Sequence, residues 1–419
     1  MSERAVVIGG GAAGMFASIQ LAKRGMDVMV LEKNEKLGKK VFITGKGRCN
    51  FTNVCDEETF FRSVMRNPKF LYSAYHAFRA QDTVEFFENA GMPVKVERGR
   101  RAFPVSDHAY DVTDALKRLM KRYGVNVLLN TEAVRIETGG EKQVTGVYFR
   151  SKEKNTDSQE EMGYAAAERV IIATGGLSYP STGSTGDGYR FARETGHTVT
   201  DCTPSLVPLL TEENVSELAG LSLKNVTLTI LKPKKMSSEI GEMLFTHKGI
   251  SGPLVLTASS ILAGEKCTFP VGAEIDLKPG ITEEELDRRI VRLFEEHGAK
   301  NLSNLLRELF PVSMINWMIR LCGLDGTEKG RDVTRKERNI LVRMTKHFPL
   351  MITGNAGYAE AVITKGGVSV KEIDPKTMMS KKIKGLYFTG EVIDTDALTG
   401  GFNLQIAWST AFAAGNAPD

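Results

Sequence analysis

The chain has 419 residues, of which 42% are hydrophobic and 25% are charged. This composition excludes a mainly disordered chain, a collagen and a small disulfide-stapled scaffold, and it predicts a soluble globular protein of more than one domain. The net charge of only +4 gives no indication of a nucleic-acid partner. Five scattered cysteines favour a reducing, cytoplasmic location. No apolar stretch has the length of a membrane span, and no His or Cys cluster has the spacing of a metal site.

The first residues predict a parallel βαβ unit. Residues 4–8 form a short apolar run that is typical of a buried strand, and residues 27–32 form a second such run. The residues between them, 12–24, have the length and composition of a helix. A strand, a glycine-rich turn, a helix and a strand within about 30 residues are the parts of a βαβ unit with parallel strands.

The turn between the first strand and the helix carries a dinucleotide fingerprint. Gly9, Gly11 and Gly14 have the spacing Gly-x-Gly-x-x-Gly. In this motif the first glycine permits a tight turn, the second lets the backbone approach a pyrophosphate, and the third lets helix and strand pack closely. Glu32 closes the second strand, where a carboxylate can accept hydrogen bonds from both ribose hydroxyls. The motif therefore predicts a bound dinucleotide without a 2′-phosphate.

The rest of the chain divides by composition into an α/β part and an insert. Residues 195–280 alternate apolar and polar residues with frequent Pro and Gly, which predicts short antiparallel strands in a small barrel. Residues 281–350 are helical and charged in pattern, with a capping box at Thr282 and Glu285. We expect an α/β fold in which a discontinuous Rossmann-like domain, 1–194 and 351–419, carries an inserted substrate or cap domain, 195–350, that is barrel-like over 195–280 and helical over 281–350. The other expected elements are helices at 69–90, 110–123, 189–195 and 402–414 and strands at 125–129, 133–137, 144–150, 168–174 and 385–389.

A second glycine-rich segment, 44–50, follows the second strand. Its sequence, Thr-Gly-Lys-Gly-Arg-Cys-Asn, suits a loop around an anion or a polar ring, and an ordinary solvated turn has the same composition. Cys49 and Cys55 lie close by, with five residues between them. Flavin-disulfide reductases have four residues between their redox-active cysteines, so the spacing argues against a catalytic disulfide.

Two later segments return the chain to the carboxyl edge of the predicted sheet. One strand ends in Thr174 and Gly175, and another ends at Glu391. An apolar helix at 402–414 begins directly after Gly401, so its positive end lies at the edge where α/β proteins bind ligands.

Together these motifs resemble the HI0933-like (YhiN/BaiN-type) flavoproteins of the two-dinucleotide-binding-domain superfamily. The resemblance covers essentially the whole chain and rests on the segments 9–14, 44–53, 99–106, 178–188, 244–253 and 399–405. The Thr-Gly-Asp-Gly sequence at 185–188 is also similar to fumarate reductase and aspartate oxidase flavoproteins. The resemblance implies an oxidoreductase that binds FAD, and no flavinylation motif is recognised, so we expect the FAD to be non-covalent.

Carried over residue by residue, the resemblance implies a complete FAD site. In the adenosine half, the pyrophosphate is expected to contact Gly9, Gly11, Ala13 and Gly14, the ribose to contact Glu32 and Lys33, and the adenine to contact the Val134 backbone. Thr174 and Gly175 are expected to line the nucleotide, and Gly390 and Glu391 to contact the pyrophosphate or ribityl chain. The ring system is expected to contact Gly45, Gly47, Arg48 and Cys49, and the pyrimidine end of the flavin to contact Gly401, Asn403 and Leu404.

The candidate catalytic residues are four side chains around the expected flavin: Arg48, Tyr179, His247 and Asn403. A structural role accounts for His247 equally well, and core packing accounts for Tyr179. The expected reaction is hydride transfer between flavin and a small organic molecule, with reduction or dehydrogenation of a C–C or C–N bond. No second Gly-x-Gly-x-x-Gly follows a strand, so NAD(P)H is a candidate electron donor without a dedicated Rossmann site.

Three alternatives stay open at this point. They are an oxygen-using amine or amino-acid oxidase, an FAD-dependent RNA-modifying protein, and a flavin redox sensor. The expected partner is a small-molecule substrate, with no nucleic acid and no membrane span. No motif specifies the substrate, the electron donor, the catalytic acid or base, or the oligomeric state.

Overall fold

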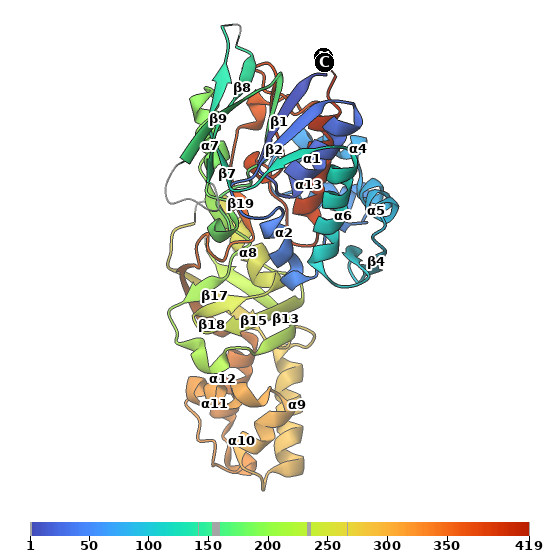
Figure 1. The fold of residues 1–419 in the computed structure, drawn as a ribbon. Coiled ribbons are helices and arrows are strands. Elements are labelled where there is room, and N and C mark those ends of the chain that lie inside the picture. Colours follow the sequence, from blue (N-terminus) through green and yellow to red (C-terminus); the bar gives the residue numbers. More distant parts are fainter. Residues whose placement is uncertain (1, 141, 153–159, 233–235, 266, 419) are drawn as a thin grey trace. The chain divides into compact units, whose positions relative to one another are not determined.

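The computed structural model describes residues 2–140, 142–152, 160–232, 236–265 and 267–418 (Figure 1). They form two compact units, of which one comprises Met1–Ser205 together with Tyr358–Asp419 and the other comprises Leu206–Gly357. The first unit is therefore discontinuous in sequence. The loop expected at 151–163 lies largely outside the described residues.

Strand pairing shows at which residues the chain passes from one unit to the other. β11 (Thr203–Ser205) pairs with β19 (Ile363–Lys365) inside the first unit. β18 (Phe348–Asn355) pairs with two strands of the second unit and continues across position 350, where the composition suggested a boundary. The composition shift at 195 precedes the crossing into the second unit, because β11 still belongs to the first.

The centre of the first unit is a five-stranded parallel sheet with the order β20-β10-β1-β2-β6. Its strands are short, and β1, β10 and β20 are buried along nearly their whole length, as parallel strands covered on both faces are. The bounds are β1 Arg4–Ile8, β2 Asp27–Leu31, β6 Asn126–Leu128, β10 Arg169–Ile172 and β20 Leu386–Phe388. The α/β class expected from the sequence is confirmed.

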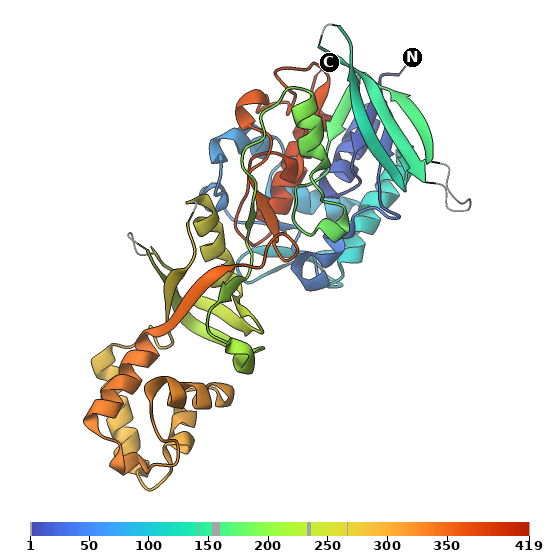
Figure 2. The ribbon, with the colours of Figure 1, turned by 90° about the vertical axis from the view of Figure 1, so that its left-hand side faces the viewer.

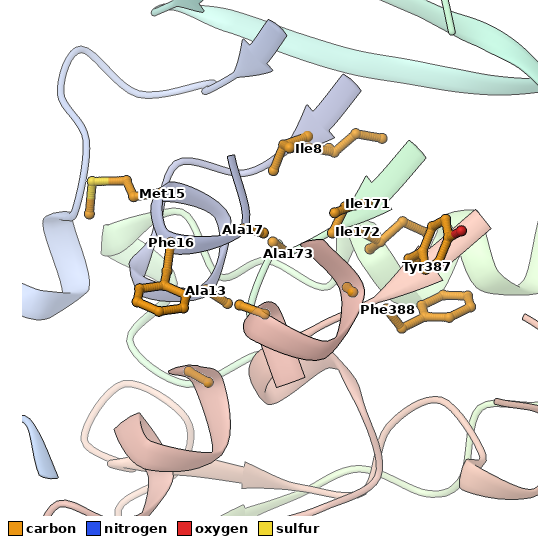
Figure 3. Close-up of a cluster of buried hydrophobic side chains, with 14 of the residues drawn as sticks. Ile8, Ala13, Met15, Phe16, Ala17, Ile171, Ile172, Ala173, Tyr387 and Phe388 are labelled. Carbon is orange, nitrogen blue, oxygen red and sulfur yellow. The ribbon is translucent and has the colours of Figure 1, made fainter. Parts of the chain in front are cut away.

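Two apolar helices, α1 (Ala12–Lys23) and α13 (Phe402–Gly415), pack against each other in this unit. α13 contains no charged residue and is buried along most of its length, which is the pattern of a helix enclosed on all sides. Figure 3 shows side chains of α1, β10 and β20 in one cluster, among them Ala17, Ile172 and Phe388. This core holds the start of both helices at the carboxyl edge of the sheet.

The expectation of a single helix over residues 69–90 is wrong. The structure has α4 (Tyr72–Ala77) and α5 (Ala80–Asn89), with Phe78 in an extended conformation between them. The Phe78 carbonyl accepts hydrogen bonds from Gln405 Nε2 and Ser409 Oγ of α13, at 3.1 and 2.7 Å. A carbonyl engaged by another helix cannot accept the hydrogen bond that would continue its own helix.

The remaining elements of the first unit surround the sheet. Two antiparallel sheets have the orders β7-β8-β9 and β3-β5-β4. The bounds are α2 Lys39–Ile43, β3 Thr52–Asn53, α3 Glu57–Ser63, β4 Val94–Glu97, β5 Arg101–Pro104, α6 Ala109–Arg122, β7 Thr131–Thr138, β8 Val144–Lys152, β9 Glu160–Ala166 and α7 Asp187–Glu194.

The second unit contains an antiparallel sheet of seven strands that closes on itself through an additional β13–β17 pairing. The expected barrel is therefore present, but α8 (Pro253–Gly264) is a helix within the stretch expected to contain only strands. The other bounds are β12 Leu209–Thr211, β13 Ser222–Leu231, β14 Met236–Ser237, β15 Gly241–Thr246, β16 Gly249–Ser251 and β17 Val271–Asp276.

The helical part of the second unit lies in sequence between the barrel strands β17 and β18 (Figure 2). Its helices are α9 Glu283–His297, α10 Leu302–Leu305, α11 Val312–Cys322 and α12 Arg335–Lys346. The capping box at Thr282 and Glu285 is confirmed, since each residue bonds the other's backbone N–H. Among the described helices, none is both long and apolar enough to cross a membrane.

A candidate dinucleotide site in the first unit

A cavity opens in the first unit at the carboxyl ends of four parallel strands. Ile8 and Leu31 line it at the ends of β1 and β2, and Ala173 and Thr389 line it just beyond β10 and β20. In open α/β sheets this edge is where the backbone turns away from the strands and leaves room for a ligand.

The glycine fingerprint lies in this cavity, and its three members have different surroundings. Gly9 has φ +102°, and a Cβ placed on it would lie 2.6 Å from the Ala173 carbonyl oxygen. A Cβ on Gly14 would lie 1.8 Å from the Gly9 oxygen, so Gly14 brings α1 against the turn. A Cβ on Gly11 would meet no atom within 4 Å, and Gly11 lines the cavity. The open space at Gly11 therefore leaves the backbone there accessible to a ligand in the cavity.

The start of α1 adds the electrostatics that an anionic ligand needs. Gly11 caps the helix without any side-chain hydrogen bond, and the first turn contains no acidic residue. The first backbone N–H groups of the helix are thus left for a ligand, and they carry the positive end of the helix dipole. This donor set suits a pyrophosphate.

Glu32 lies beside the glycine turn and is only 7% exposed. Its Oε2 accepts a hydrogen bond from the Gly10 N–H at 2.7 Å, and its Oε1 accepts from the backbone and side chain of Asn34 at 2.8 and 2.7 Å. These bonds fix the carboxylate against the cavity wall, with lone pairs left for ribose hydroxyls. Lys33, the next residue, donates to Asp187 Oδ2 at 2.5 Å, and both residues line the cavity.

At the other end of the cavity, Glu391 is the centre of a hydrogen-bond network. Its Oε1 accepts from Ser178 Oγ at 2.6 Å and from the Thr364 N–H at 2.9 Å. Its Oε2 accepts from Lys40 Nζ at 2.7 Å, and Lys40 Nζ also donates to Ser178 Oγ at 2.6 Å. Sequence reasoning missed Lys40, because a lysine in the run Gly-Lys-Lys at 38–40 carries no spacing signal of its own.

The structure brings most of the expected cofactor residues together in this one cavity. Those that line it are Gly9, Gly11, Ala13, Glu32, Lys33, Thr174, Gly175, Gly390, Glu391, Asn403 and Leu404. The other residues expected to contact the cofactor are not among those that line the cavity. They are Gly14, Gly45, Gly47, Arg48, Cys49, Val134 and Gly401.

Val134 lies at a bulge in β7, where the pairing with β8 shifts register between Ala133 and Arg135. Its carbonyl oxygen accepts from Arg190 Nη1 at 2.7 Å. The preceding residues, 131–133, line the cavity instead. The bulge therefore lies directly beside the residues of β7 that line the cavity.

Arg48 is held by acidic and aromatic neighbours. Its guanidinium donates to Asp107 at 2.8 and 2.5 Å, pairs with Glu97, and lies 4.4 Å from the centre of the Phe103 ring. Hydrogen bonds from Arg48 lower the pKa of Glu97, and bonds from Lys95 and Arg48 lower that of Asp107. The arrangement fixes the 44–50 loop to β4 and the segment after β5.

Asn403 braces the loop before α13. Its Oδ1 accepts from the Ala397 N–H at 2.9 Å, and its Nδ2 donates to the Ala397 carbonyl at 2.7 Å. Gly401 has φ +96°, and a Cβ placed there would lie 2.5 Å from the Thr52 backbone. The glycine at 401 is thus required by packing against β3, while Asn403 and Leu404 form the cavity wall.

The last two candidate catalytic residues have different environments. Tyr179 has φ +51°, its backbone N–H donates to the Tyr358 carbonyl at 2.9 Å, and burial raises its pKa. His247 belongs to the second unit, where it is exposed in the turn between β15 and β16. Their roles stay predictions.

Known proteins are similar to this chain in sequence and in fold. A family model described as HI0933-like protein Rossmann domain matches residues 3–417. The chain belongs to the HI0933-like family. A ribosomal RNA dihydrouridine synthase of Haemophilus influenzae is 34% identical over 413 residues, which cover 97% of this chain and 96% of the relative. A 3-dehydro-bile acid delta(4,6)-reductase of Clostridium scindens is 31% identical and covers 99% of this chain and 98% of the relative.

Solved structures show the same fold as this HI0933-like protein. The 3-ketosteroid delta1-dehydrogenase from Sterolibacterium denitrificans has a TM-score of 0.53 at 15% identity, with 99% of both chains covered. The 3-ketosteroid-delta4-(5alpha)-dehydrogenase from Rhodococcus jostii has a TM-score of 0.51 at 13% identity, with 99% of this chain and 97% of that chain covered. These two structures show the fold, while the family and its reductase member confirm the expected enzyme class, an oxidoreductase.

Native Cys49 of the HI0933-like protein is expected to resist alkylation at pH 8. The thiol is fully buried, and burial raises its pKa to about 12, so almost no thiolate is available to react. Iodoacetamide labelling followed by mass spectrometry of the native and unfolded protein checks this, with the partly exposed Cys267 as internal control. Labelling of native Cys49 as fast as that of Cys267 would contradict the structure.

Proposed function

We propose that this protein binds FAD non-covalently and transfers hydride between the flavin and a small organic substrate, at a C–C or C–N bond. The observation that supports this best is the single cavity that begins at Gly11 and Glu32 and reaches Glu391, Asn403 and Leu404. One end has the glycine turn, helix N-terminus and buried carboxylate that suit an ADP moiety. The other end has the ion pair of Lys40 and Glu391 together with neutral groups, which suit a ribityl chain and a flavin ring.

The chain's own groups have separate tasks in this proposal. The N–H groups at the start of α1 hold the pyrophosphate, and Glu32 holds the ribose. Lys40, Ser178 and Glu391 form a fixed polar wall that orients the chain between the pyrophosphate and the ring. The bound flavin supplies the hydride chemistry, which no side chain can perform alone.

Reduction of a carbon–carbon double bond is the reaction direction that the relatives favour. One of them is named a delta(4,6)-reductase, and the other is named for a dihydro product, which is a substrate plus two hydrogens. NAD(P)H is the proposed electron donor, and it would reduce the flavin without a second fingerprint motif. We place the protein in the cytoplasm, where reduced nicotinamides are available.

RNA modification is the second candidate function. The relative named ribosomal RNA dihydrouridine synthase is 34% identical over nearly the full length of both chains. In that case the reduced bond would belong to a uracil ring in an RNA instead of a free metabolite. We expect no nucleic-acid partner because positive and negative charges nearly balance, with a net charge of +4. The RNA-modification alternative contradicts that expectation.

The purified protein is expected to be yellow and to release intact FAD when it is denatured by acid or heat. The fingerprint and Glu32 supply the adenosine contacts, and no covalent attachment is expected. Absorbance before denaturation and chromatography of the released flavin check the prediction. A colourless protein that cannot be reconstituted with FAD would refute the assignment.

Reduction and reoxidation of the bound flavin in the absence of oxygen identify the substrate class, and an assay in air tests for an oxidase. We expect NADH or NADPH to bleach the yellow protein, and we expect a panel of conjugated enones to restore the colour. Restoration by unmodified ribosomal RNA transcripts and not by enones would favour the RNA function. Peroxide release during turnover with amines or amino acids in air would favour an oxidase.

A further inference from the structure

Four charged side chains that the proposed function does not use gather beside the cavity. They are Asp394 and Asp396 in the segment before α13, Lys365 on β19, and Arg66 before the turn at 68–71. The side chains of Asp394, Asp396 and Lys365 are 4%, 0% and 6% exposed. We call these four residues the buried charge cluster. Charges removed so fully from water are costly unless they are paired and hydrogen-bonded.

Asp396 is the member of the cluster in which both carboxylate oxygens lack a hydrogen-bond donor within the described part of the chain, whereas in Asp394 only Oδ1 does. Both of its carboxylate oxygens are buried and accept no hydrogen bond from the described residues. Lys365 Nζ lies 3.8 Å from Asp396 Oδ2, which is an ion-pair distance beyond hydrogen-bond range. The main-chain carbonyl of Asp396, in contrast, accepts from the backbone N–H groups of Met65 and Arg66 at 2.8 and 3.4 Å. The backbone is therefore fixed while the carboxylate is held in a poorly solvating site.

Compared with water, such a site makes the carboxylate less favourable relative to the protonated acid. Burial raises the pKa of Asp396 from 3.8 to about 6, Asp394 adds to the shift, and Lys365 and Arg66 oppose it. Burial also lowers the pKa of Lys365, which Asp396 counteracts. Arg66 forms its ion pair with Asp394, so Lys365 is the cation that faces Asp396.

Two short connections link Asp396 to the cavity. The next residue, Ala397, is bonded through both its N–H and its carbonyl to Asn403, which lines the cavity. Lys365 lies two residues after Ile363 on β19, and Ile363 also lines the cavity. Side chains two apart on a strand point to the same face, so Lys365 lies on the face of β19 that carries Ile363, just beyond the residues that line the cavity.

The charge of the cluster can therefore respond to charge in the cavity. With all four groups ionised, the two cations and two carboxylates sum to zero. Protonation of Asp396 gives the cluster a charge of +1, which lowers the energy of a negative charge nearby. A flavin ring that gains two electrons and one proton carries one negative charge more than before, and a protein charge that changes with it stabilises the reduced state.

We propose that Asp396 is a proton-binding site that takes up one proton from solvent when the flavin in the adjoining cavity is reduced by two electrons, and releases it when the flavin is reoxidised. This rests on the proposed function, because it needs a flavin in the cavity. The electrons come from a two-electron donor of the dihydronicotinamide class. Reduction of a carbon–carbon double bond consumes one hydride and one proton, so Asp396 stores one proton equivalent for each hydride equivalent held by the flavin.

The proposal gives the pH dependence of the flavin midpoint potential a defined shape. Below a pH of about 6, Asp396 is already protonated with oxidised flavin and adds no proton on reduction. Above that pH, and up to its higher pKa with reduced flavin, reduction takes up one extra proton. For a two-electron couple, each extra proton makes the potential fall by about 30 mV more per pH unit, which is the equivalent of a tenfold change in the equilibrium constant.

The test is a spectroelectrochemical titration of the purified holoenzyme between about pH 5 and pH 9. We expect Asp396→Asn to bind FAD and to lose the extra slope above pH 6, while it matches the wild-type slope below that pH. Asp394→Asn is the matched control, since it removes a carboxylate of the same loop that is already paired with Arg66. It is expected to keep the extra slope, with an onset at lower pH than in the wild type, because Asp394 no longer raises the pKa of Asp396.

The outcomes separate this proposal from its alternatives. Parallel curves for wild type and Asp396→Asn, or loss of the extra slope only in Asp394→Asn, would overturn it and leave the cluster a structural ion-pair group. If Asp396→Asn does not retain flavin, reduced-minus-oxidised infrared spectra of the wild type decide. A carboxylic-acid band that appears on reduction above pH 6 supports the proposal, and its absence overturns it. A colourless wild-type protein would instead refute the proposed function.

Discussion

Gly14→Ala is expected to prevent stable folding of the first unit and to yield protein without bound flavin. The added methyl group would lie 1.8 Å from the Gly9 carbonyl oxygen and 3.3 Å from the Ala173 Cβ. The closest atom belongs to the backbone of the glycine turn, so no side chain can rotate away to relieve the clash. Overpacking of a core costs about 1–3 kcal/mol, and a backbone clash is expected to cost at least the upper value. Urea unfolding and flavin content of the purified protein measure the effect.

Gly11→Ala is the matched control for this substitution. Gly11 has φ −79° and ψ −168°, which any residue adopts, and a Cβ there meets no atom within 4 Å. We expect Gly11→Ala to fold with wild-type stability and to bind FAD more weakly, because the methyl group enters the space proposed for the pyrophosphate. Equal stability of the two variants would show that the close approach of α1 to the glycine turn is misplaced.

Glu32→Ala is expected to weaken FAD binding by about 10²- to 10⁴-fold. Two hydrogen bonds from ribose hydroxyls to a carboxylate are lost, at about 1.5–3 kcal/mol each. The apoprotein is also expected to lose about 1–3 kcal/mol of stability, since the buried Gly10 N–H loses its acceptor at 2.7 Å. Fluorescence titration of apoprotein with FAD and urea unfolding of apoprotein measure the two effects separately.

Asp27→Ala controls for the loss of a carboxylate at β2, the strand that Glu32 directly follows. Asp27 is exposed at the opposite end of β2 from the cavity, so its removal should change neither FAD affinity nor stability appreciably. Glu32→Gln should be intermediate, because an amide retains one acceptor oxygen but cannot accept from both the Gly10 N–H and Asn34. Wild-type affinity in Glu32→Ala would show that Glu32 only anchors the glycine turn.

The expected site could be read from the sequence where its residues are neighbours in the chain. Gly9, Gly11 and Glu32 belong to one βαβ unit, whose spacing alone brings them together. Gly45, Gly47 and Arg48 were placed at the ring system from a motif, yet the structure holds Arg48 on Glu97 and Asp107. Those acidic partners come from separate elements, and no local pattern in the sequence pairs them with Arg48.

The sequence by itself determined the parallel α/β sheet, the glycine fingerprint and the apolar helix at 402–414, because each follows from spacing or hydrophobicity within a few turns of chain. Only the tertiary structure decided the rest. Phe78 ends a helix because α13 takes its carbonyl, and Lys40 meets Glu391 because strands far apart in sequence end at one edge of the sheet. Asp396 is likewise buried by segments that are distant in sequence. Its pKa is raised because these segments exclude water from the carboxylate, which no local sequence pattern encodes.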